Sequence, residues 1–426
     1  MFRSFSILLL LIVWIGPACC ARAAQDNDAW PEFRGPTQQG HAPAGAEPPL
    51  KWSDQEHVRF KTAIPGRGWS SPVVLGQQVW MTTASEDGTS RRAVCVDKRA
   101  GSILHDVEVF HVGSPSRVNA FNSYASPSPV IEDGRVYVCF GSDGTACLDT
   151  ATAKPVWVNQ ELRVMHMEGA GSSPVVYGDL LILTFDGIDA QFVTALDKRT
   201  GKQVWKTART TPFPFTAFPP FRKAYGTPIV IRVDGKDQLI SPAARRVYAY
   251  DPSTGAELWH IDLEPPAYNT APRPVYADGV LYVCTGYDRA QLWAIRVDAQ
   301  SVGDCTATHV LWKYARGAPL KPSPLLLGDE LYTVGDNGIA KCFDVKTGDE
   351  IWHSRIGNAY SASPVEAGGR LYFFGEGGRS VVLQAGREFK ILADNYLDGG
   401  GCLATPAFSG KAIFLRSRTH LYRIEN

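Results

Sequence analysis

A recurring motif constrains the fold of this chain more than any other sequence feature. Three full copies run from a small residue through an Asp and a Thr-Gly pair to a Trp: Ala195–Trp205, Ala249–Trp259 and Cys342–Trp352. The Thr-Gly pair is typical of a tight hairpin turn, because glycine adopts positive φ angles at little cost. One hairpin alone cannot bury a Trp side chain, so each copy needs a neighbouring copy. The motif therefore predicts a β-repeat protein.

A proline followed by a short apolar run marks each repeat. Between successive prolines the sequence reads as four strands separated by Gly-containing turns. The prolines lie 40 to 57 residues apart, close to the roughly 40–50 residues of a propeller blade. Four strands per unit and eight units predict an all-β chain folded as one eight-bladed β-propeller of four-stranded blades. The marking prolines are Pro72, Pro129, Pro174, Pro228, Pro274, Pro324, Pro364 and Pro406.

The last repeat is one strand short. After Pro406 the chain has only Lys411–Arg416 and His420–Ile424 as further strand candidates, whereas Val58–Ile64 reads as an unpaired outer strand before the first repeat. Pairing these segments would close the ring and remove two exposed sheet edges. We therefore expect the N-terminal strand to complete the last blade. An open solenoid is the alternative.

The N-terminal region has the features of a secretory signal peptide over residues 1–23. Its apolar run, Phe5–Ile15, is too short to span a bilayer, and Ala21-Arg22-Ala23 resembles a cleavage site. We expect export to the periplasm or cell envelope, with no transmembrane span, and leave lipidation at Cys19 or Cys20 open. Residues 24–49 lack periodicity and form an irregular segment expected to lie over one face. Residues 50–426 form the propeller.

Charge and cysteine placement restrict the partners and the covalent structure. Lys plus Arg equals Asp plus Glu at 43 each, which argues against a nucleic-acid-binding surface. Seven cysteines follow the predicted signal peptide. Cys95, Cys147 and Cys342 occupy a repeat position that holds Ala in other copies, such as Ala195, so they read as small core residues. We expect mostly buried free thiols rather than a disulfide framework, in a monomer.

Strand order places the links between repeats, and the turns between second and third strands, on one face of the ring. Residues just before each proline therefore surround the channel mouth. Their mixture of aromatic, acidic, basic and amide groups suits an envelope protein or a small polar ligand, although the same residue types also shape turns. The predicted binding residues are Trp69, Asn122, Tyr124, His166, Glu168, Arg222, Tyr225, Arg273, Lys321 and Tyr360.

Sequence signatures of catalysis are missing. His166-Met167-Glu168 matches the H-x-E of zinc deaminases, but no P-C-x-x-C follows it. There is no H-E-x-x-H, C-x-x-C, G-x-S-x-G or phosphate-binding loop. Asp186-Gly-Ile-Asp189 could contact a cation, but a hairpin turn with this sequence needs none. We predict no catalytic residues, no metal site and no cofactor.

The A-x-D-x-x-T-G-x-x-x-W repeat resembles the quinoprotein, or PQQ-like, repeat family of β-propellers over residues 50–424. Trp30–Pro36 and Glu168–Pro174 are also similar to secreted, planctomycete-type propellers of this family. The resemblance implies one of two branches. One contains dehydrogenases that use pyrroloquinoline quinone (PQQ) and calcium, and the other contains non-catalytic scaffolds such as the outer-membrane assembly lipoprotein BamB.

The dehydrogenase branch implies two adjacent cysteines in the mature chain, whereas the only adjacent pair here is Cys19-Cys20. Our first hypothesis is therefore an exported, non-catalytic, BamB-like binding or scaffold module. One alternative is a PQQ- and calcium-dependent oxidoreductase, with Glu168 and turn aspartates near calcium and Arg273 or Lys321 near the quinone carboxylates. Another is a carbohydrate-binding or sugar-active propeller that stacks sugars on Trp69, Tyr124 and Tyr360.

Overall fold

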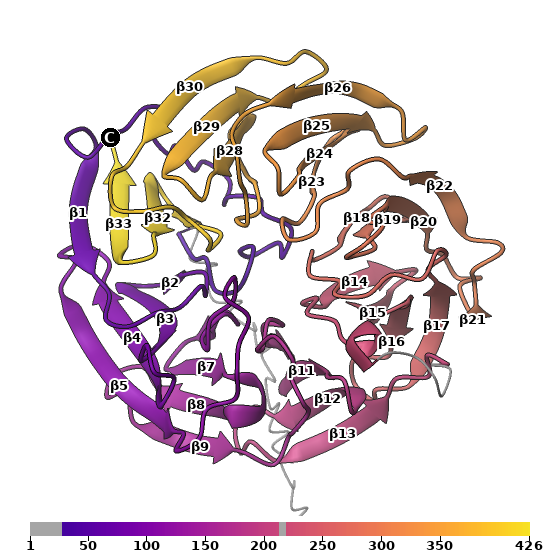
Figure 1. The fold of residues 1–426 in the computed structure, drawn as a ribbon, viewed down its shortest axis with the longest axis horizontal. Helices are drawn as coiled ribbons and strands as arrows, with labels where there is room; N and C mark the ends of the chain where they lie inside the picture. Colours follow the sequence, from indigo (N-terminus) through magenta and orange to yellow (C-terminus); the bar gives the residue numbers. More distant parts are fainter. Residues whose placement is uncertain (1–27, 213–218) are drawn as a thin grey trace, which may run out of the picture.

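The computed structural model describes residues 28–212 and 219–426, so the predicted signal peptide lies outside the described residues. Eight sheets are arranged around a central axis, and the four blade strands of each are antiparallel (Figure 1). Seven have four strands and the remaining one has five. The prediction of an all-β, eight-bladed propeller is confirmed.

Each blade runs from an inner to an outer strand, and its inner strand begins directly after the proline that marks the repeat. Blades 1 to 4 are β2 (Val73–Leu75), β3 (Gln78–Ala84), β4 (Ser90–Asp97) and β5 (Ile103–His111); β6 (Val130–Glu132), β7 (Arg135–Cys139), β8 (Thr145–Asp149) and β9 (Pro155–Asn159); β10 (Val175–Tyr177), β11 (Leu180–Asp186), β12 (Gln191–Asp197) and β13 (Gln203–Ala208); and β14 (Ile229–Val233), β15 (Lys236–Pro242), β16 (Arg246–Tyr250) and β17 (Glu257–Asp262).

The remaining blades follow the same order along the chain. They are β18 (Val275–Ala277), β19 (Val280–Cys284), β20 (Leu292–Arg296) and β22 (Val310–Tyr314); β23 (Leu325–Leu327), β24 (Glu330–Val334), β25 (Ile339–Asp344) and β26 (Glu350–Arg355); β27 (Val365–Ala367), β28 (Arg370–Phe374), β29 (Arg379–Gln384) and β30 (Ile391–Tyr396); and β31 (Ala407–Ser409), β32 (Ala412–Arg416) and β33 (His420–Glu425) with β1 (Val58–Ala63).

The ring closes as the sequence predicts. Strand β1 pairs antiparallel with β33, with Ala63 opposite His420, and so supplies the outer strand of the last blade (Figure 1). Both ends of the propeller therefore lie in one sheet, and neither β1 nor β33 is left without its expected partner. This pairing removes the two free edges that an open arc of blades would have.

At three places in the described ring an outer-strand Trp reaches the Thr-Gly turn of the following blade: Trp157 lies against Gly201, Trp205 against Gly255 and Trp312 against Gly348. The Trp157 indole donates a hydrogen bond to the carbonyl oxygen of Lys198 at 2.9 Å. Gly201 in that turn has a φ of +71°, and a Cβ atom there would lie 2.5 Å from Trp157. The turn therefore needs glycine twice, for its backbone angle and for the space that the indole occupies. In the closing blade Phe60 covers Gly101 in the same way.

A second set of contacts joins the blades at the channel. The residue before the marking proline is Ser or Thr in every blade except one, which has Arg273. In six blades the backbone N–H of this residue donates to the hydroxyl oxygen of the equivalent residue in the next blade, at 2.9–3.0 Å. The blades joined in this way contribute Ser71, Ser128, Ser173 and Thr227 on one side, and Arg273, Ser323, Ser363 and Thr405 on the other.

The irregular N-terminal segment enters the channel instead of lying over one face. Trp30 exchanges backbone hydrogen bonds with Val74, and Gln39 accepts one from the backbone N–H of Tyr276. Arg34, fully buried, donates to the carbonyl oxygen of Pro324 at 2.7 Å. In Figure 1 this violet trace crosses the centre of the ring. The free edges of the inner strands supply these hydrogen-bond partners, which explains why an aperiodic segment is ordered there.

Two other departures from the repeat have clear structural outcomes. His105, at the Trp position of the first repeat, stacks on Trp80 at 5.8 Å between ring centroids, as expected for a packed outer-strand residue. The segment Asp298–Thr308 is an insert before Trp312 that the repeat pattern does not account for. Its β21 (Gly303–Asp304) adds to blade 4 as a fifth strand, parallel to β17.

The structure shows the state of the cysteines and part of a Pro- and Phe-rich insert, Thr210–Tyr225. The cysteines of the described residues are all buried and free: Cys95, Cys139, Cys147, Cys284, Cys305, Cys342 and Cys402. This confirms the expectation of buried free thiols, which is based on the alanine position that Cys95, Cys147 and Cys342 occupy. Within the insert Thr210–Tyr225, residues 213–218 lie outside the described residues, and Pro219–Arg222 forms the short 3-10 helix η2. Across the described residues, no helix has the length and apolar character needed to cross a membrane.

The contact between the indole and the turn predicts a difference between two glycines of blade 3. Gly178 has a φ of +55° but open space around it, whereas Gly201 has the indole against it. Both Ala variants carry the cost of about 1–2 kcal/mol for a left-handed non-glycine residue. For Gly201→Ala the free energy of unfolding should fall by a further ~1–3 kcal/mol, because the added methyl group overpacks against the indole. Denaturant unfolding of both variants measures the difference. Equal losses of stability would contradict the proposed contact between Trp157 and the Gly201 turn.

Candidate functional site

A pocket of about 500 Å³ opens at the channel mouth. Phe33, from the N-terminal segment, forms part of its lining, so the segment closes the channel beneath it. The hydroxyl-bearing residues that join the blades form the inner wall, and the links between blades form the rim. The lining includes Trp69, Ser71, Asn119, Phe121, Asn122, Ser128, Glu168, Ser173, Tyr225, Thr227, Asn269, Tyr287, Lys321, Asp336, Ser363 and Thr405.

One wall is organised around Glu168. Its carboxylate pairs with the buried Lys223 ammonium at 2.7 Å and accepts a hydrogen bond from the Tyr225 hydroxyl at 2.9 Å. Its backbone oxygen accepts a bond from the Asn122 side chain at 2.7 Å. Burial and the nearby Glu168 charge raise the pKa of Tyr225, which therefore remains a neutral donor. These contacts fix the Glu168 side chain as an oriented hydrogen-bonding group.

The opposite wall carries a second charged cluster. The Lys321 ammonium lies 3.1 Å from Glu376 and 3.4 Å from Asp336. The pKa of Glu376 is lowered: burial alone would raise it, but hydrogen bonds from Ser361 and Lys321 outweigh burial. The carboxylate is therefore ionised and paired at neutral pH.

Trp69 lies between two guanidinium groups at the channel mouth. Arg67 lies 5.1 Å from its ring centroid and Arg418 lies 5.4 Å from it. Arg67 also donates to the carbonyl oxygen of Ala120 at 2.8 Å, which ties this ring to the neighbouring link. The two cations hold the indole in place, and its contact with a ligand would be through the part that faces the pocket.

The structure brings half of the predicted binding residues together in this pocket: Trp69, Asn122, Glu168, Tyr225 and Lys321. It places Tyr124 and His166 away from the lining. Tyr124 packs under the Arg91 guanidinium, which lies 4.3 Å from its ring centroid, and His166 is half-buried beside Phe185. Both side chains hold links in place behind the rim.

Arg222, Arg273 and Tyr360 also lie outside the pocket lining. Arg273 is fully buried and turns toward the N-terminal segment, where it contacts Glu32 at 3.2 Å and donates to Gln38 at 2.9 Å. Tyr360 is 1% exposed and donates to the Ile356 carbonyl oxygen. Arg222 ends η2. With Tyr124 and Tyr360 both covered, the expected row of sugar-stacking aromatics is reduced to Trp69.

Sequence reasoning missed an apolar rim around this polar pocket. Phe121 is 81% exposed, Met165 59%, Met167 48% and Tyr287 50%. These residues lie in adjoining links and turns: Asn119 N–H donates to the Glu168 carbonyl oxygen, and the Lys223 ammonium lies 3.9 Å from the Met167 sulfur. A single Phe in an otherwise polar link was the one sequence signal for this surface.

A family model described as "Outer membrane protein assembly factor BamB" matches residues 46–207 and 189–426. The chain belongs to this family. A curated BamB of Shewanella oneidensis is 20% identical over 54% of this chain and 56% of its own length. A quinoprotein ethanol dehydrogenase of Pseudomonas aeruginosa is 29% identical over 30% of this chain and 22% of its own length. The chain thus spans only about half, and about a fifth, of these two relatives.

Solved structures that are similar to this chain share the fold at low sequence identity. BamB from Moraxella catarrhalis has a TM-score of 0.57 at 16% identity, covering 86% of this chain and 99% of that one. A europium-containing methanol dehydrogenase has a TM-score of 0.62 at 12% identity, covering 93% of this chain and 89% of that one. Non-catalytic and enzymatic propellers therefore both resemble this ring, and the likeness establishes the fold alone.

The residues suggested for calcium and quinone do not fit that group. Glu168 is already paired with Lys223, and the buried Asp186 is paired with Arg209 at 2.9 Å. Arg273 points to the N-terminal segment, away from the mouth. Protein cations therefore already neutralise the Glu168 and Asp186 carboxylates, and the Arg273 guanidinium does not face a quinone carboxylate in the pocket.

His166 gives the rim a specific pH dependence. Burial lowers its pKa from 6.5 to about 4, although Asp143 and Asp189 oppose this shift, and neither ring nitrogen has a hydrogen-bond partner among the described residues. The unfolded chain takes up this proton near pH 6.5, so stability is full above that pH and falls as pH drops toward 4. Urea unfolding at pH 7.5 and 5 should show a smaller loss for His166→Gln than for wild type. An equal loss of stability in both proteins would show that His166 is not the source of this pH dependence.

Proposed function

We propose that this chain is an exported, non-catalytic binding or scaffold module of the cell envelope, and that its channel mouth receives a loop of a partner protein. The observation that carries the proposal is the exposed apolar rim, with Phe121, Met165, Met167 and Tyr287, around a pocket whose charged groups are already paired. A small polar metabolite would fill the pocket without covering the rim. A protein loop would cover both.

Rim and pocket have the chemistry that protein interfaces use. Aromatic and Met side chains are enriched at interface centres, and Met adapts to irregular partner surfaces. Phe121 and Tyr287 line the pocket as well as the rim, so one loop could insert between them. The hydroxyl and amide groups beneath, including Asn122 and Ser128, would then meet the polar backbone of that loop.

Preorganisation supports the same function. The Glu168 and Lys321 clusters are held by ion pairs and hydrogen bonds before any partner arrives. Little side-chain entropy is lost when such fixed groups bind, so more of the contact free energy appears as affinity. The propeller ring beneath them is closed, which limits movement of one wall relative to the other.

Family membership supports placement in the envelope. The printed description of the family is an outer membrane assembly factor, and the Shewanella oneidensis relative has that name. Carrying that role to this chain agrees with the predicted signal peptide at residues 1–23. A partner among envelope proteins follows, and its chemistry would be a loop with apolar side chains.

The rim predicts which substitutions weaken binding. Phe121→Ala combined with Tyr287→Ala should lower partner affinity by at least about tenfold, since truncating a central interface aromatic costs about 1–2 kcal/mol or more. The matched control is Ile103→Ala with Leu104→Ala, two exposed residues on outer strand β5. Photocrosslinkers placed at Phe121 and at Ile103 in the native envelope measure contact directly.

The outcomes separate the alternatives. A protein captured at position 121 but not at 103 supports the proposal, and equal capture at both positions contradicts it. Saturable binding of PQQ with calcium, abolished by Glu168→Gln, would instead support an oxidoreductase. Binding on a glycan array that is lost with Trp69→Ala would support a carbohydrate-binding role.

A further inference from the structure

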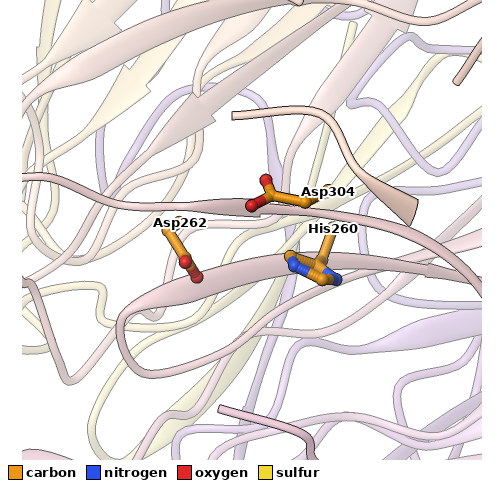
Figure 2. A group of neighbouring side chains, drawn as sticks. All are labelled: His260, Asp262 and Asp304. Carbon is orange, nitrogen blue, oxygen red and sulfur yellow. The ribbon is translucent and has the colours of Figure 1, made fainter. Parts of the chain in front are cut away.

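Three metal-ligating side chains meet at the outer corner of blade 4, far along the blade from the channel mouth. His260 and Asp262 alternate on β17, so both side chains project from the same face of the strand. Asp304 lies on the added strand β21, directly opposite His260 in the register. One ligand atom from each lies within 4.8 Å of the other two, and Figure 2 shows the three side chains grouped together.

We propose that His260, Asp262 and Asp304 bind one divalent transition-metal ion. The sequence predicts no metal site, because these residues match no motif and no local sequence signal indicates the pairing of β21 with β17. Two ligands at alternate positions of one strand and a third on the adjoining strand occupy one face of the ion. The other coordination positions remain for water.

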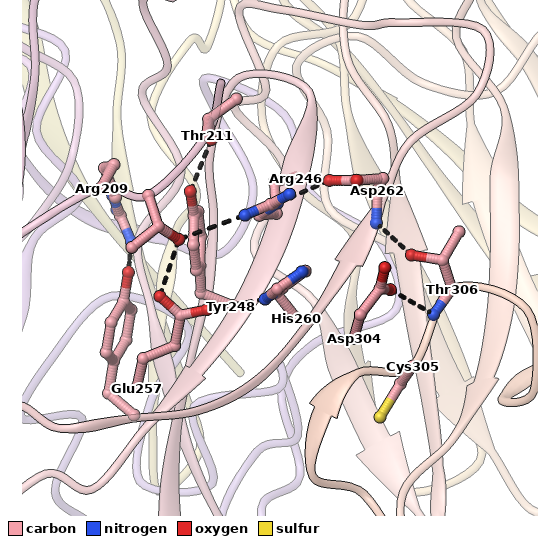
Figure 3. Close-up of polar contacts among 12 residues, drawn as sticks. Arg209, Thr211, Arg246, Tyr248, Glu257, His260, Asp262, Asp304, Cys305 and Thr306 are labelled. Atoms are coloured by element: carbon pink, nitrogen blue, oxygen red, sulfur yellow. Dashed lines mark hydrogen bonds and ion pairs between the residues drawn. The ribbon is translucent and has the colours of Figure 1, made fainter. Parts of the chain in front are cut away.

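The imidazole is oriented for this role by Glu257. Its carboxylate lies 2.7 Å from His260 Nδ1, which fixes the ring and makes Nδ1 the protonated nitrogen. Figure 3 shows the other ring nitrogen on the side of Asp262 and Asp304. A carboxylate behind the imidazole is the usual outer partner of a metal-ligating histidine, where it sets the tautomer and raises the basicity of the ligand.

The local charge balance favours a cation. Asp262, Asp304 and Glu257 bring three carboxylates to this corner. Arg246 is the cation bonded to the cluster, with its Nε 2.5 Å from one oxygen of Asp262. That bond orients Asp262 and leaves its second oxygen for the ion. Three carboxylates against one guanidinium leave a net charge of two negatives, which a divalent ion would neutralise.

The ligand set indicates the class of ion. An imidazole nitrogen with two carboxylates suits Zn²⁺, Mn²⁺ and related ions better than Mg²⁺ or Ca²⁺, which prefer oxygen ligands alone. Bonds of about 2.0–2.2 Å place ligand atoms about 3–3.5 Å apart in a four-coordinate site. Small side-chain rotations close the remaining gap, because Asp304 is exposed and Asp262 is half-buried.

Blade 6 shows which part of the arrangement is specific. There Glu350 and His353 repeat the pair of Glu257 and His260, with 2.5 Å between Glu350 and His353 Nδ1. The position equivalent to Asp262 is Arg355, and the sheet has no fifth strand. A Glu-His pair on an outer strand is therefore an ordinary feature of this repeat. Only blade 4 adds the two aspartates, one of them on an insert that the propeller does not need.

The ion would attach the insert to the blade. At present β21 is held by the Cys305 N–H, which donates to the His260 carbonyl oxygen at 2.9 Å, and by the Thr306 hydroxyl, which accepts from the Asp262 N–H at 2.9 Å. An ion that joins Asp304 to His260 and Asp262 adds a third attachment. We therefore expect metal to slow backbone hydrogen exchange in the insert without altering the ring.

The test is isothermal titration of Zn²⁺ into the full mature chain, freed of affinity tag and of chelator. Wild type should bind one equivalent saturably, and a large excess of Mg²⁺ should not compete. His260→Gln and Asp304→Asn should each lower the affinity at least about tenfold, as loss of a ligand does. Hydrogen exchange at residues 303–306 should slow with Zn²⁺ in wild type and stay unchanged in Asp304→Asn.

Two controls keep the test decisive. His353→Gln removes the equivalent pair of blade 6, and Cys305→Ser removes the buried thiol next to Asp304; both should retain wild-type affinity. Unfolding curves without metal establish that each variant is folded. The proposal is overturned if wild type shows no saturable site, if His353→Gln weakens binding as much as His260→Gln, or if Cys305→Ser abolishes it.

Discussion

The contact between an outer-strand Trp and the Thr-Gly turn of the next blade is the interaction on which the rest of the structure depends. It joins neighbouring blades through one aromatic ring, as Trp157 does at Gly201, Trp205 at Gly255 and Trp312 at Gly348, and it works only if the turn has no side chain. A blade cannot bury that ring alone, so the contact is satisfied only in a series of blades. Phe60 makes the equivalent contact across the closure, on Gly101 of the first blade, so the last blade is joined to the first in the same way.

The inner ring of hydroxyl groups adds a second constraint at a smaller radius. Six of the Ser and Thr residues before a marking proline accept a backbone N–H from the preceding blade, which fixes the spacing of the inner strands: Ser128, Ser173, Thr227, Ser323, Ser363 and Thr405. Arg273 breaks this ring at one place, and its side chain instead binds Glu32, Gln38 and the Phe33 carbonyl oxygen. Arg273, the one residue of this set that is not Ser or Thr, thus anchors the N-terminal segment that closes the channel. The pocket exists because an inner wall of hydroxyls and a floor that includes Phe33 meet there.

The predictable part of this protein is the part that repeats. Prolines, Thr-Gly turns and Trp positions are local signals, so the blades, the closure by β1 and the burial of cysteines at alanine positions all follow from them. The site was predictable as a face, since strand order places the links together. Individual side chains were not, because their partners are remote in sequence: Tyr124 is covered by Arg91 and Arg273 by the N-terminal segment. Equally, no local signal indicates that Asp298–Thr308 pairs with the preceding blade.

Binding sites in such a ring are expected where the repeat is broken, because the repeated positions are occupied by the contacts that hold the blades together. The pocket depends on links of unequal length, on Arg273 and on an aperiodic segment. The corner of blade 4 depends on an insert that most blades lack. His260 and His353 illustrate this rule. The repeat supplies a histidine and its glutamate in both blades, and the inserted strand adds Asp304 opposite His260 alone. A stable ring therefore leaves its links and inserts free to acquire different chemistry, which is consistent with a single fold serving both scaffolds and enzymes.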